Sequence, residues 1–277
     1  MSIHQRVPSA PLNHYVAWLW YYVDLFPDHE REHVLPDGTF ELMINLEERP
    51  RKLFDRTNLS RHQTFRRGWM SGTHKEYLVI DALQGSTMIG AHFKPGGATG
   101  LLGIPAAELT GRVVELDALW GNDIWDWREQ LFSTTGPQRK LALFEKLLTE
   151  RLSQTNSKCP DNRRMKWALG RLLQTPELPS IRVLTQELGM SHKHFIEQFR
   201  RQVGLTPKLF CRIRRFQQVL AHVQSGKNVK WADIACNCGY FDQAHFVNDF
   251  VAFAGLNPSA YLRQHLEGDP NFVRANG

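Results

Sequence analysis

Hydrophobic and polar residues follow different periods in the two halves of this chain. In residues 33–46 a Pro36-Asp37-Gly38 turn is followed by alternating apolar positions, which predicts a strand entering a hairpin. Further strands are predicted at residues 66–70, 77–82 and 88–93, and helices from residue 122 to residue 152. The first half is therefore expected to be a β-rich domain followed by helices.

The second half has apolar residues at helical spacing, and one arrangement of them occurs twice. Two phenylalanines four positions apart are followed by Gly-Leu-x-Pro, and the second copy lies 51 residues after the first. Phenylalanines at this spacing lie on one face of a helix, the Gly can end that helix in the left-handed conformation, and the Pro can begin the next helix. Such a repeat indicates one structural unit used twice. The matching residues are Phe195, Phe199, Gly204, Leu205 and Pro207, and then Phe246, Phe250, Gly255, Leu256 and Pro258.

Each copy is preceded by a second, shorter helical segment. The first begins at Ile181 and the second at Trp231; each is followed by a turn that contains Gly, and Ser191 and Asp242 can cap the helix that comes next. A short helix, a tight turn and a second helix form a helix-turn-helix, which lays its second helix in the major groove of DNA. The sequence predicts two such units, at about residues 181–203 and 231–252.

The second unit carries a recognisable signature. Residues 232–250 read Ala-Asp-Ile-Ala-Cys-Asn-Cys-Gly-Tyr-Phe-Asp-Gln-Ala-His-Phe-Val-Asn-Asp-Phe, and Gly255-Leu-Asn-Pro-Ser-Ala-Tyr261 follows. This sequence resembles the long and specific signature of the AraC family of bacterial transcription regulators. The resemblance covers roughly residues 161–266, and it implies two helix-turn-helix units joined by a long helix, here about Pro207 to Gln224. Members of that family often have a basic residue where this chain has Asn248.

Charge is distributed unevenly along the chain. Residues 1–156 contain 17 Lys and Arg against 19 Asp and Glu, and residues 157–277 contain 17 against 9, so the net charges are −2 and +8. A basic domain behind a near-neutral one is typical of a polyanion binder with an attached domain of another function. Together with the repeated unit, this distribution favours DNA binding over a basic surface that is only solvated.

The length of 277 residues allows two domains with separate cores. We expect an α+β protein with a β-rich effector or association domain at residues 1–152, a polar linker at 153–160 and an all-α DNA-binding domain at 161–277. No apolar run could span a bilayer, the N-terminus lacks the core of a secretory signal, and the cysteines show no framework of spaced pairs. These features predict a cytoplasmic protein.

Helical geometry indicates which side chains face DNA. If the paired phenylalanines point into the core, Lys193, Glu197 and Arg200 face outward in the first recognition helix, with Ile196 on the flank. Lys193 can donate to guanine, Glu197 can accept from cytosine, and Ile196 can touch a thymine methyl. In the second helix the outward residues are Gln243, Ala244, Val247 and Asn248, of which Gln243 and Asn248 suit adenine.

Phosphate contacts are expected from basic residues at the start of the domain and on the linking helix. The candidates are Arg163, Arg164, Lys166, Lys208, Arg212, Arg214, Arg215, Lys227 and Lys230.

The N-terminal half contains segments similar to a poorly characterised sensor domain found ahead of AraC-type DNA-binding domains. These segments are Leu35-Pro-Asp-Gly38, the run from Gly90 to Gly97, and Leu116-Asp-Ala-Leu-Trp-Gly121. The aromatic and histidine residues of this half can line a small-molecule pocket, or they can be plain core. The candidates are Trp69, His74 and His92, together with Trp18, Trp20 and Tyr22.

Two motifs in the N-terminal half resemble motifs of enzymes. His29-Glu-Arg-Glu-His33 satisfies the H-E-x-x-H zinc pattern, but Pro27 and Pro36 leave no room for the helix that this site needs, so a polar turn between strands is expected. The glycines from Gly97 to Gly103 resemble a dinucleotide fingerprint, but Pro105 would break the helix that must follow, so a loop leading into a short helix is expected. Neither a metal nor a cofactor is expected.

Three classes of function are consistent with these patterns. The duplicated unit favours a sequence-specific transcription regulator without enzymatic activity, controlled by a small molecule or partner at the N-terminal domain. Its expected partners are double-stranded DNA, RNA polymerase, a small-molecule effector and a second copy in a homodimer, and no membrane. The alternatives are a zinc- or nucleotide-dependent enzyme fused to a DNA-binding domain, and an architectural DNA binder without sequence preference.

Overall fold

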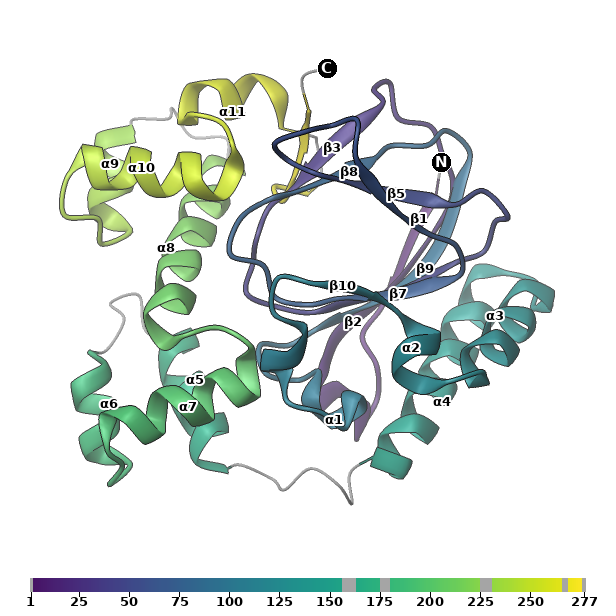
Figure 1. The fold of residues 1–277 in the computed structure, drawn as a ribbon, viewed down its shortest axis with the longest axis horizontal. Helices are drawn as coiled ribbons and strands as arrows, with labels where there is room; N and C mark the ends of the chain where they lie inside the picture. The colour runs from purple at the N-terminus through teal and green to yellow at the C-terminus, as the bar shows by residue number, and fades with distance from the viewer. Residues whose placement is uncertain (1, 156–162, 175–179, 225–230, 266–268, 276–277) are drawn as a thin grey trace.

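The computed structural model describes residues 2–155, 163–174, 180–224, 231–265 and 269–275. A β-rich domain with its own helices comes first, and a helical domain follows (Figure 1). The predicted α+β class with two structurally different parts is confirmed. Within the described residues, none of the helices has the length and apolar character that crossing a bilayer requires.

Two antiparallel sheets form the β-rich domain. Among the described residues, one sheet has the order β1-β2-β9-β4-β7-β10 and the other the order β11-β3-β8-β5-β6. The strands are β1 (Ser2–Arg6), β2 (Val16–Leu25), β3 (Arg31–Val34), β4 (Glu41–Asn45), β5 (Arg51–Phe54), β6 (His62–Phe65), β7 (Gly68–Ser71), β8 (Leu78–Asp81), β9 (Ser86–Phe93), β10 (Val113–Glu115) and β11 (Phe272–Arg274).

The sheet that contains β2 has two apolar faces. Leu19 and Tyr21 of β2 are buried in the main core of the domain, which also includes Phe144 and Leu148 of a covering helix. Trp20 and Tyr22 alternate with them and pack on the opposite face, in a cluster with residues of the second sheet. The helices of this domain are η1 (Leu12–His14), α1 (Thr99–Leu102), η2 (Ala106–Leu109), α2 (Leu116–Trp120), α3 (Asp123–Ser133) and α4 (Pro137–Thr155), and Figure 1 shows α3 and α4 to one side of the strands.

One of the strand predictions needs correction. The segment 33–46 does not form a hairpin, because β3 pairs with β8 while β4 pairs with β7 and β9 in the other sheet. The Pro36-Asp37-Gly38 turn therefore carries the chain from one sheet to the other, and Asp37 accepts a hydrogen bond from the Thr39 amide at 2.9 Å within it. The strand predicted at 66–70 is present as β7, which begins two residues later, at Gly68, and ends at Ser71.

The helical domain consists of two similar groups of helices joined by one long helix. The first group contains α5 (Arg163–Gln174), α6 (Ile181–Glu187) and α7 (His192–Val203), and the second contains α9 (Trp231–Asn237), α10 (Gln243–Ala254) and α11 (Pro258–Gln264). The joining helix is α8 (Pro207–Gln224), and Figure 1 shows it running between the groups. The phenylalanines of the repeat are buried together with Phe210 and Phe216 of α8 in one core.

Two details of the domain boundaries differ from expectation. Helix α4 continues to Thr155, so the first three residues of the expected linker 153–160 are helical, and the rest of it lies outside the described residues. The C-terminal part is also not entirely helical, because β11 pairs with β3 of the β-rich domain. A three-residue strand has too short a pattern to be detected in the sequence.

Candidate nucleic-acid interface

The first helix-turn-helix is built from α6 and α7. The Ser191 hydroxyl caps α7 by accepting a hydrogen bond from the His194 amide at 3.3 Å, and Gly204 ends the helix with a φ of +89°. Phe195 and Phe199 are fully buried, so the other side of α7 faces outward. Lys193, Glu197 and Arg200 are exposed and Ile196 is half-buried. The arrangement allows all four to approach DNA, and their contacts with bases stay a prediction.

The second unit repeats this geometry with α9 and α10. The Asp242 carboxylate accepts a hydrogen bond from the His245 amide at 2.7 Å, and Gly255 ends α10 with a φ of +71°. Phe246 and Phe250 face the core. The predicted outward set agrees in exposure, since Gln243, Ala244 and Asn248 are exposed and Val247 is half-buried.

The turn of the second unit exposes a residue that the helical pattern did not single out. Phe241 is 92% exposed, more than any other large apolar side chain in the described residues. It lies between the buried Tyr240 and the capping Asp242, outside the helix, so a helical wheel does not place it. Its position directly before a helix cap is the only sequence signal that points to it.

The two units differ strongly in charge. Residues 181–203 contain four Lys and Arg against two Glu, whereas residues 231–254 contain three Asp and no Lys or Arg. One of these acids, Asp249, is buried and paired with Arg212 at 2.5 Å. The first unit therefore provides most of the positive charge near a recognition helix.

The basic residues of α8 point in different directions. Lys208 is exposed, as a phosphate contact requires. Arg212 is occupied by Asp249, and Arg215 donates to the Gly239 carbonyl oxygen at 3.1 Å. Burial lowers the pKa of Arg214 while the Asp37 carboxylate opposes that shift, which places Arg214 beside the N-terminal domain rather than on a free DNA-facing surface.

The remaining phosphate candidates lie on α5 or outside the described residues. Arg163 and Arg164 are exposed at the start of α5. Lys227 and Lys230 lie outside the described residues.

A groove of about 870 Å³ lies between the two units. It is lined by Ile196 of α7, by Lys208, Cys211 and Arg215 of α8, and by Cys236 and Cys238 at the end of α9. Burial raises the pKa of the Cys211 and Cys238 thiols to about 11, so both are protonated at neutral pH. The groove brings Lys208 and Arg215 onto one concave surface.

The N-terminal domain contacts the first helix-turn-helix near the end of α7. Gln202 donates to the Gly96 carbonyl oxygen at 2.7 Å and to the Thr99 hydroxyl at 2.9 Å. The Thr110 hydroxyl donates to the Gly204 carbonyl oxygen at 2.5 Å. A Cβ atom at Gly204 would lie 2.5 Å from the Thr73 hydroxyl, so this glycine serves both the helix end and the domain contact.

The same domain also contacts the joining helix α8 and the second helix-turn-helix. Gln217 of α8 donates to the Pro36 carbonyl oxygen at 2.9 Å, and a His33 ring nitrogen lies 3.0 Å from the Ala254 carbonyl oxygen. Gly255 packs against the Tyr77 ring, which a Cβ atom would approach to 2.5 Å. Strand β11 then follows α11 into the sheet beside β3. Both helix-turn-helix units are therefore docked on the N-terminal domain in this conformation.

The three proposed effector-site residues are buried or half-buried in the N-terminal domain. Trp69 is buried against Phe65 and Met88. Nε2 of His74 lies 2.9 Å from the Ser71 hydroxyl, and burial lowers the pKa of His74 to about 4. His92 stacks on Trp18 with ring centroids 3.9 Å apart. Their binding of an effector stays a prediction.

Acidic neighbours control the charge of His92. Its Nδ1 lies 2.6 Å from Glu41 and its Nε2 lies 3.4 Å from Asp37. Burial by itself would lower its pKa, but Glu41 above all, with Asp37 and Asp269, outweighs burial and raises the pKa to about 9. His92 is therefore a cation at neutral pH, between β4, β9 and the C-terminal segment.

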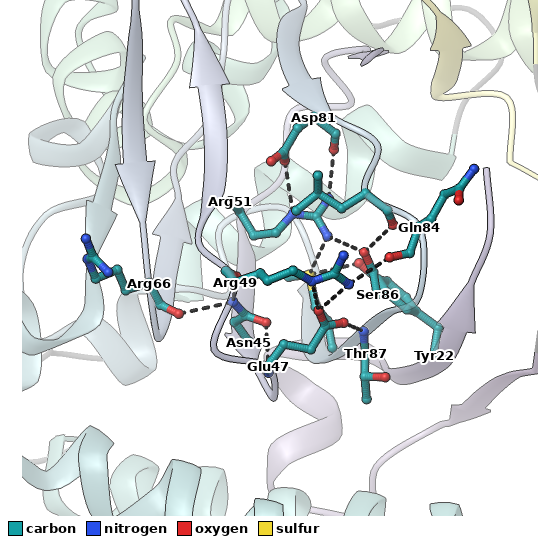
Figure 2. A network of polar contacts seen from close by, with 12 residues as sticks. Tyr22, Asn45, Glu47, Arg49, Arg51, Arg66, Asp81, Gln84, Ser86 and Thr87 are labelled. Atoms are coloured by element: carbon teal, nitrogen blue, oxygen red, sulfur yellow. Dashed lines mark hydrogen bonds and ion pairs between the residues drawn. The ribbon is translucent and has the colours of Figure 1, made fainter. Parts of the chain in front are cut away.

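A polar network ties the two sheets together (Figure 2). The Arg51 guanidinium donates to the Asp81 carboxylate at 3.0 Å and to the Ser86 hydroxyl at 2.8 Å. The Tyr22 hydroxyl donates to the sulfur of Met88 at 2.8 Å, and burial raises the pKa of Tyr22 to about 12. Because Ser86 belongs to β9 and Arg51 to β5, the Arg51–Ser86 bond joins the two sheets.

The two enzyme-like motifs have structural positions of their own. The His29–His33 segment is a turn that enters β3, where His29 contacts Glu32 at 2.7 Å and His33 reaches the second reading unit. The glycine-rich segment leads into the four-residue helix α1. Within the described residues, no three His, Cys, Asp or Glu side chains are grouped to hold a metal ion.

Two capped recognition helices, one joining helix and a separate β-rich domain define a DNA-binding protein of the double helix-turn-helix class. Residues 184–264 match a family described as a helix-turn-helix domain, and residues 4–115 match a domain of unknown function, DUF6597. With the signature at residues 232–261, residues 184–264 form an AraC-type helix-turn-helix domain, and the protein is a transcription regulator of that type.

Several solved structures are similar to the whole chain at low sequence identity. An apo variant of ToxT from Vibrio cholerae has a TM-score of 0.48 and 13% identity, covering 88% of this chain and 97% of that one. Wild-type ToxT from the same organism, bound to an unsaturated fatty acid, has a TM-score of 0.46 and 12% identity, covering 93% and 96%. The AraC-like transcriptional activator CuxR has a TM-score of 0.30 and 15% identity, covering 80% and 87%. No curated protein matches the chain significantly.

Proposed function

We propose that this regulator reads two successive major-groove segments of one DNA site, one with each helix-turn-helix. The observation that carries the proposal is the repetition of a buried phenylalanine pair opposite an exposed helix face, in α7 and again in α10. Units in successive turns of the major groove are about 10 base pairs apart, so one protomer covers roughly 20 base pairs. The site is asymmetric because the outward residues of the two helices differ.

The N-terminal domain controls reading by how it holds the two units. Its contacts with Gln202 and Gln217 lie on α7 and on α8, so a shift in either contact changes the spacing of the recognition helices. A small molecule between the sheets, near Trp69, His74 and His92, is the proposed effector. It acts only to the extent that it binds one arrangement of the domains more tightly than another.

The wider setting of the proposal is that of a bacterial regulator. The protein acts in the cytoplasm, contacts RNA polymerase when bound to DNA, can form a homodimer through its N-terminal domain, and has no enzymatic activity of its own. Metal or cofactor that copurifies in stoichiometric amount would argue for the enzyme alternative.

Selection of duplexes from a random library by the purified full-length protein tests the proposal. We expect a motif of two blocks one helical turn apart, preferred about 10³-fold or more over scrambled DNA. A single block would mean that only one unit reads bases. Equal affinity for all sequences with steep salt dependence would contradict the proposal and favour an architectural binder.

A further inference from the structure

The second recognition helix presents an apolar surface rather than a charged one. On the side of α10 away from the core, Ala244 is exposed, Val247 is half-buried and Val251 is 43% exposed. Residues 231–254 contain no Lys or Arg. Guanine is read most often by Arg or Lys, so this unit lacks the side chains for it.

Phe241 extends this surface at the N-terminal end of α10, the end of a recognition helix that contacts base edges. Its neighbours are fixed on both sides, because Tyr240 packs edge-on against Phe246 with ring centroids 5.4 Å apart and Asp242 caps α10. The backbone of the turn is held as well, since the Tyr240 amide donates to the Ala235 carbonyl oxygen at 3.0 Å. The Phe241 ring is therefore held outward at the N-terminus of the recognition helix.

We propose that Phe241 is a specificity-determining residue that reads thymine through its 5-methyl group, so that the second unit selects an A·T-rich block. Alanine and phenylalanine are among the side chains that contact thymine methyls, and Gln243 and Asn248 suit adenine. The first unit, with Lys193 and Arg200, selects a block that contains G·C. The proposal rests on the proposed function, because it assigns base composition to the two blocks of the same site.

The charge distribution supports DNA of this composition. The first unit and α8 carry cations that can contact phosphates, whereas the second unit has no Lys or Arg; its acids are the exposed Asp233 on α9, the capping Asp242, and Asp249, which is paired with Arg212. Its contribution to affinity therefore comes from contact area in the groove and depends little on salt. A methyl contact is one of the few base contacts that an apolar side chain can make.

The test replaces thymine by uracil in the second block of the selected duplex, which removes the methyl and leaves base pairing intact. We expect full-length protein to bind about 4-fold more weakly for each contacted methyl lost. Phe241→Ala should weaken binding to the thymine duplex and abolish the penalty at the methyl that Phe241 contacts. Phe241→Leu, which keeps an apolar side chain, should restore part of that penalty.

Two controls separate the methyl contact from other effects. Uracil in the spacer should have no effect, and Phe132→Ala, which removes a phenylalanine 61% exposed on α3, should behave as wild type. Because Phe241 contributes nothing to the core, its variants should keep the wild-type melting temperature.

Three results would overturn the inference. These are a selected second block without A·T preference, a wild-type affinity indifferent to uracil there, and an undiminished uracil penalty in Phe241→Ala. In each case sequence-specific binding itself would persist, and the proposed function with it. If no selected duplex is bound in preference to scrambled DNA, the proposed function fails and this inference fails with it.

Discussion

His74 and His92 lie in the same domain and have different charge states at neutral pH: His74 is neutral and His92 is a cation. Both are removed from bulk water, which by itself favours the neutral imidazole. His74 follows that tendency, whereas the carboxylates around His92 reverse it. Burial therefore decides that His74 is neutral, whereas the surrounding carboxylates decide that His92 is a cation.

Protonated His92 should stabilise the protein in a defined pH range. Because its pKa in the folded protein is about 9, above the ordinary value of 6.5, its contribution is fully present below pH 6.5 and is lost as the pH rises through 9. His92→Gln should therefore lower the unfolding free energy on the order of 2 kcal/mol at pH 6.5 and much less at pH 10. Thermal unfolding at both pH values measures this. His14→Gln, at an exposed position, serves as the control, and an equal loss at both pH values would contradict the raised pKa.

Lys193 should affect base preference at one position. Its exposed side chain lies near the start of α7, where recognition helices contact base edges. Lys193→Ala should cost about 1 to 3 kcal/mol on the preferred duplex and relax selectivity at a single base pair. Binding to a set of singly substituted duplexes measures the effect. An unchanged base preference at every position would show that Lys193 does not contact a base.

Lys208 should act on DNA of any sequence. It is a cleaner phosphate test than Arg215, whose guanidinium also holds the Gly239 turn. Lys208→Ala should weaken binding to preferred and scrambled duplexes alike and reduce the slope of log K against log salt by about 1. Titrations at several salt concentrations measure that slope, and an unaltered slope would argue against a phosphate contact.

At the scale of elements, the two recognition helices are held by the same three devices. Each has a side-chain cap at its start, a buried phenylalanine pair in its middle and a left-handed glycine at its end. These devices act locally, so they are visible in the sequence. The strands lack comparable local markers, because their partners lie far along the chain.

Removal of the Asp242 cap should destabilise α10 more than removal of the Ser191 cap destabilises α7. The Asp242 bond is shorter, at 2.7 Å against 3.3 Å, and its charge also interacts favourably with the helix N-terminus. Asp242→Ala should cost about 1 to 2 kcal/mol and Ser191→Ala about 0.5 to 1 kcal/mol. Chemical denaturation compares them, and the reverse order would contradict the capping argument.

At the scale of the whole molecule, the chain returns to its first domain after the second reading unit. Strand β11 pairs with β3, and the Leu35 amide donates to the Asn271 carbonyl oxygen at 2.8 Å beside it. Val273 is fully buried at this junction, in the core of the helical domain. The junction therefore couples the position of α11 to the β-rich domain.

Val273→Asp should undock β11 while the contacts of the first unit persist. A buried unpaired carboxylate costs several kcal/mol. This cost exceeds the stabilisation that pairing of the three-residue strand β11 with β3 supplies. Hydrogen exchange should become faster in β3 and α11 and remain slow around Gln202. The matched control is Arg274→Ala, which removes only an exposed ion pair with Asp28 and should change little. Unchanged protection in β3 would contradict the coupling.

The sequence alone determined the duplicated reading unit, because helix periods, caps and turn glycines are local and were present twice. It also predicted the outward faces of α7 and α10 from the positions of the paired phenylalanines. Only the tertiary structure decided which strands share a sheet, that Arg212 is paired and Arg214 turned toward the N-terminal domain, and that β11 joins β3. These features depend on contacts between residues far apart in the chain, and no local pattern carries that information.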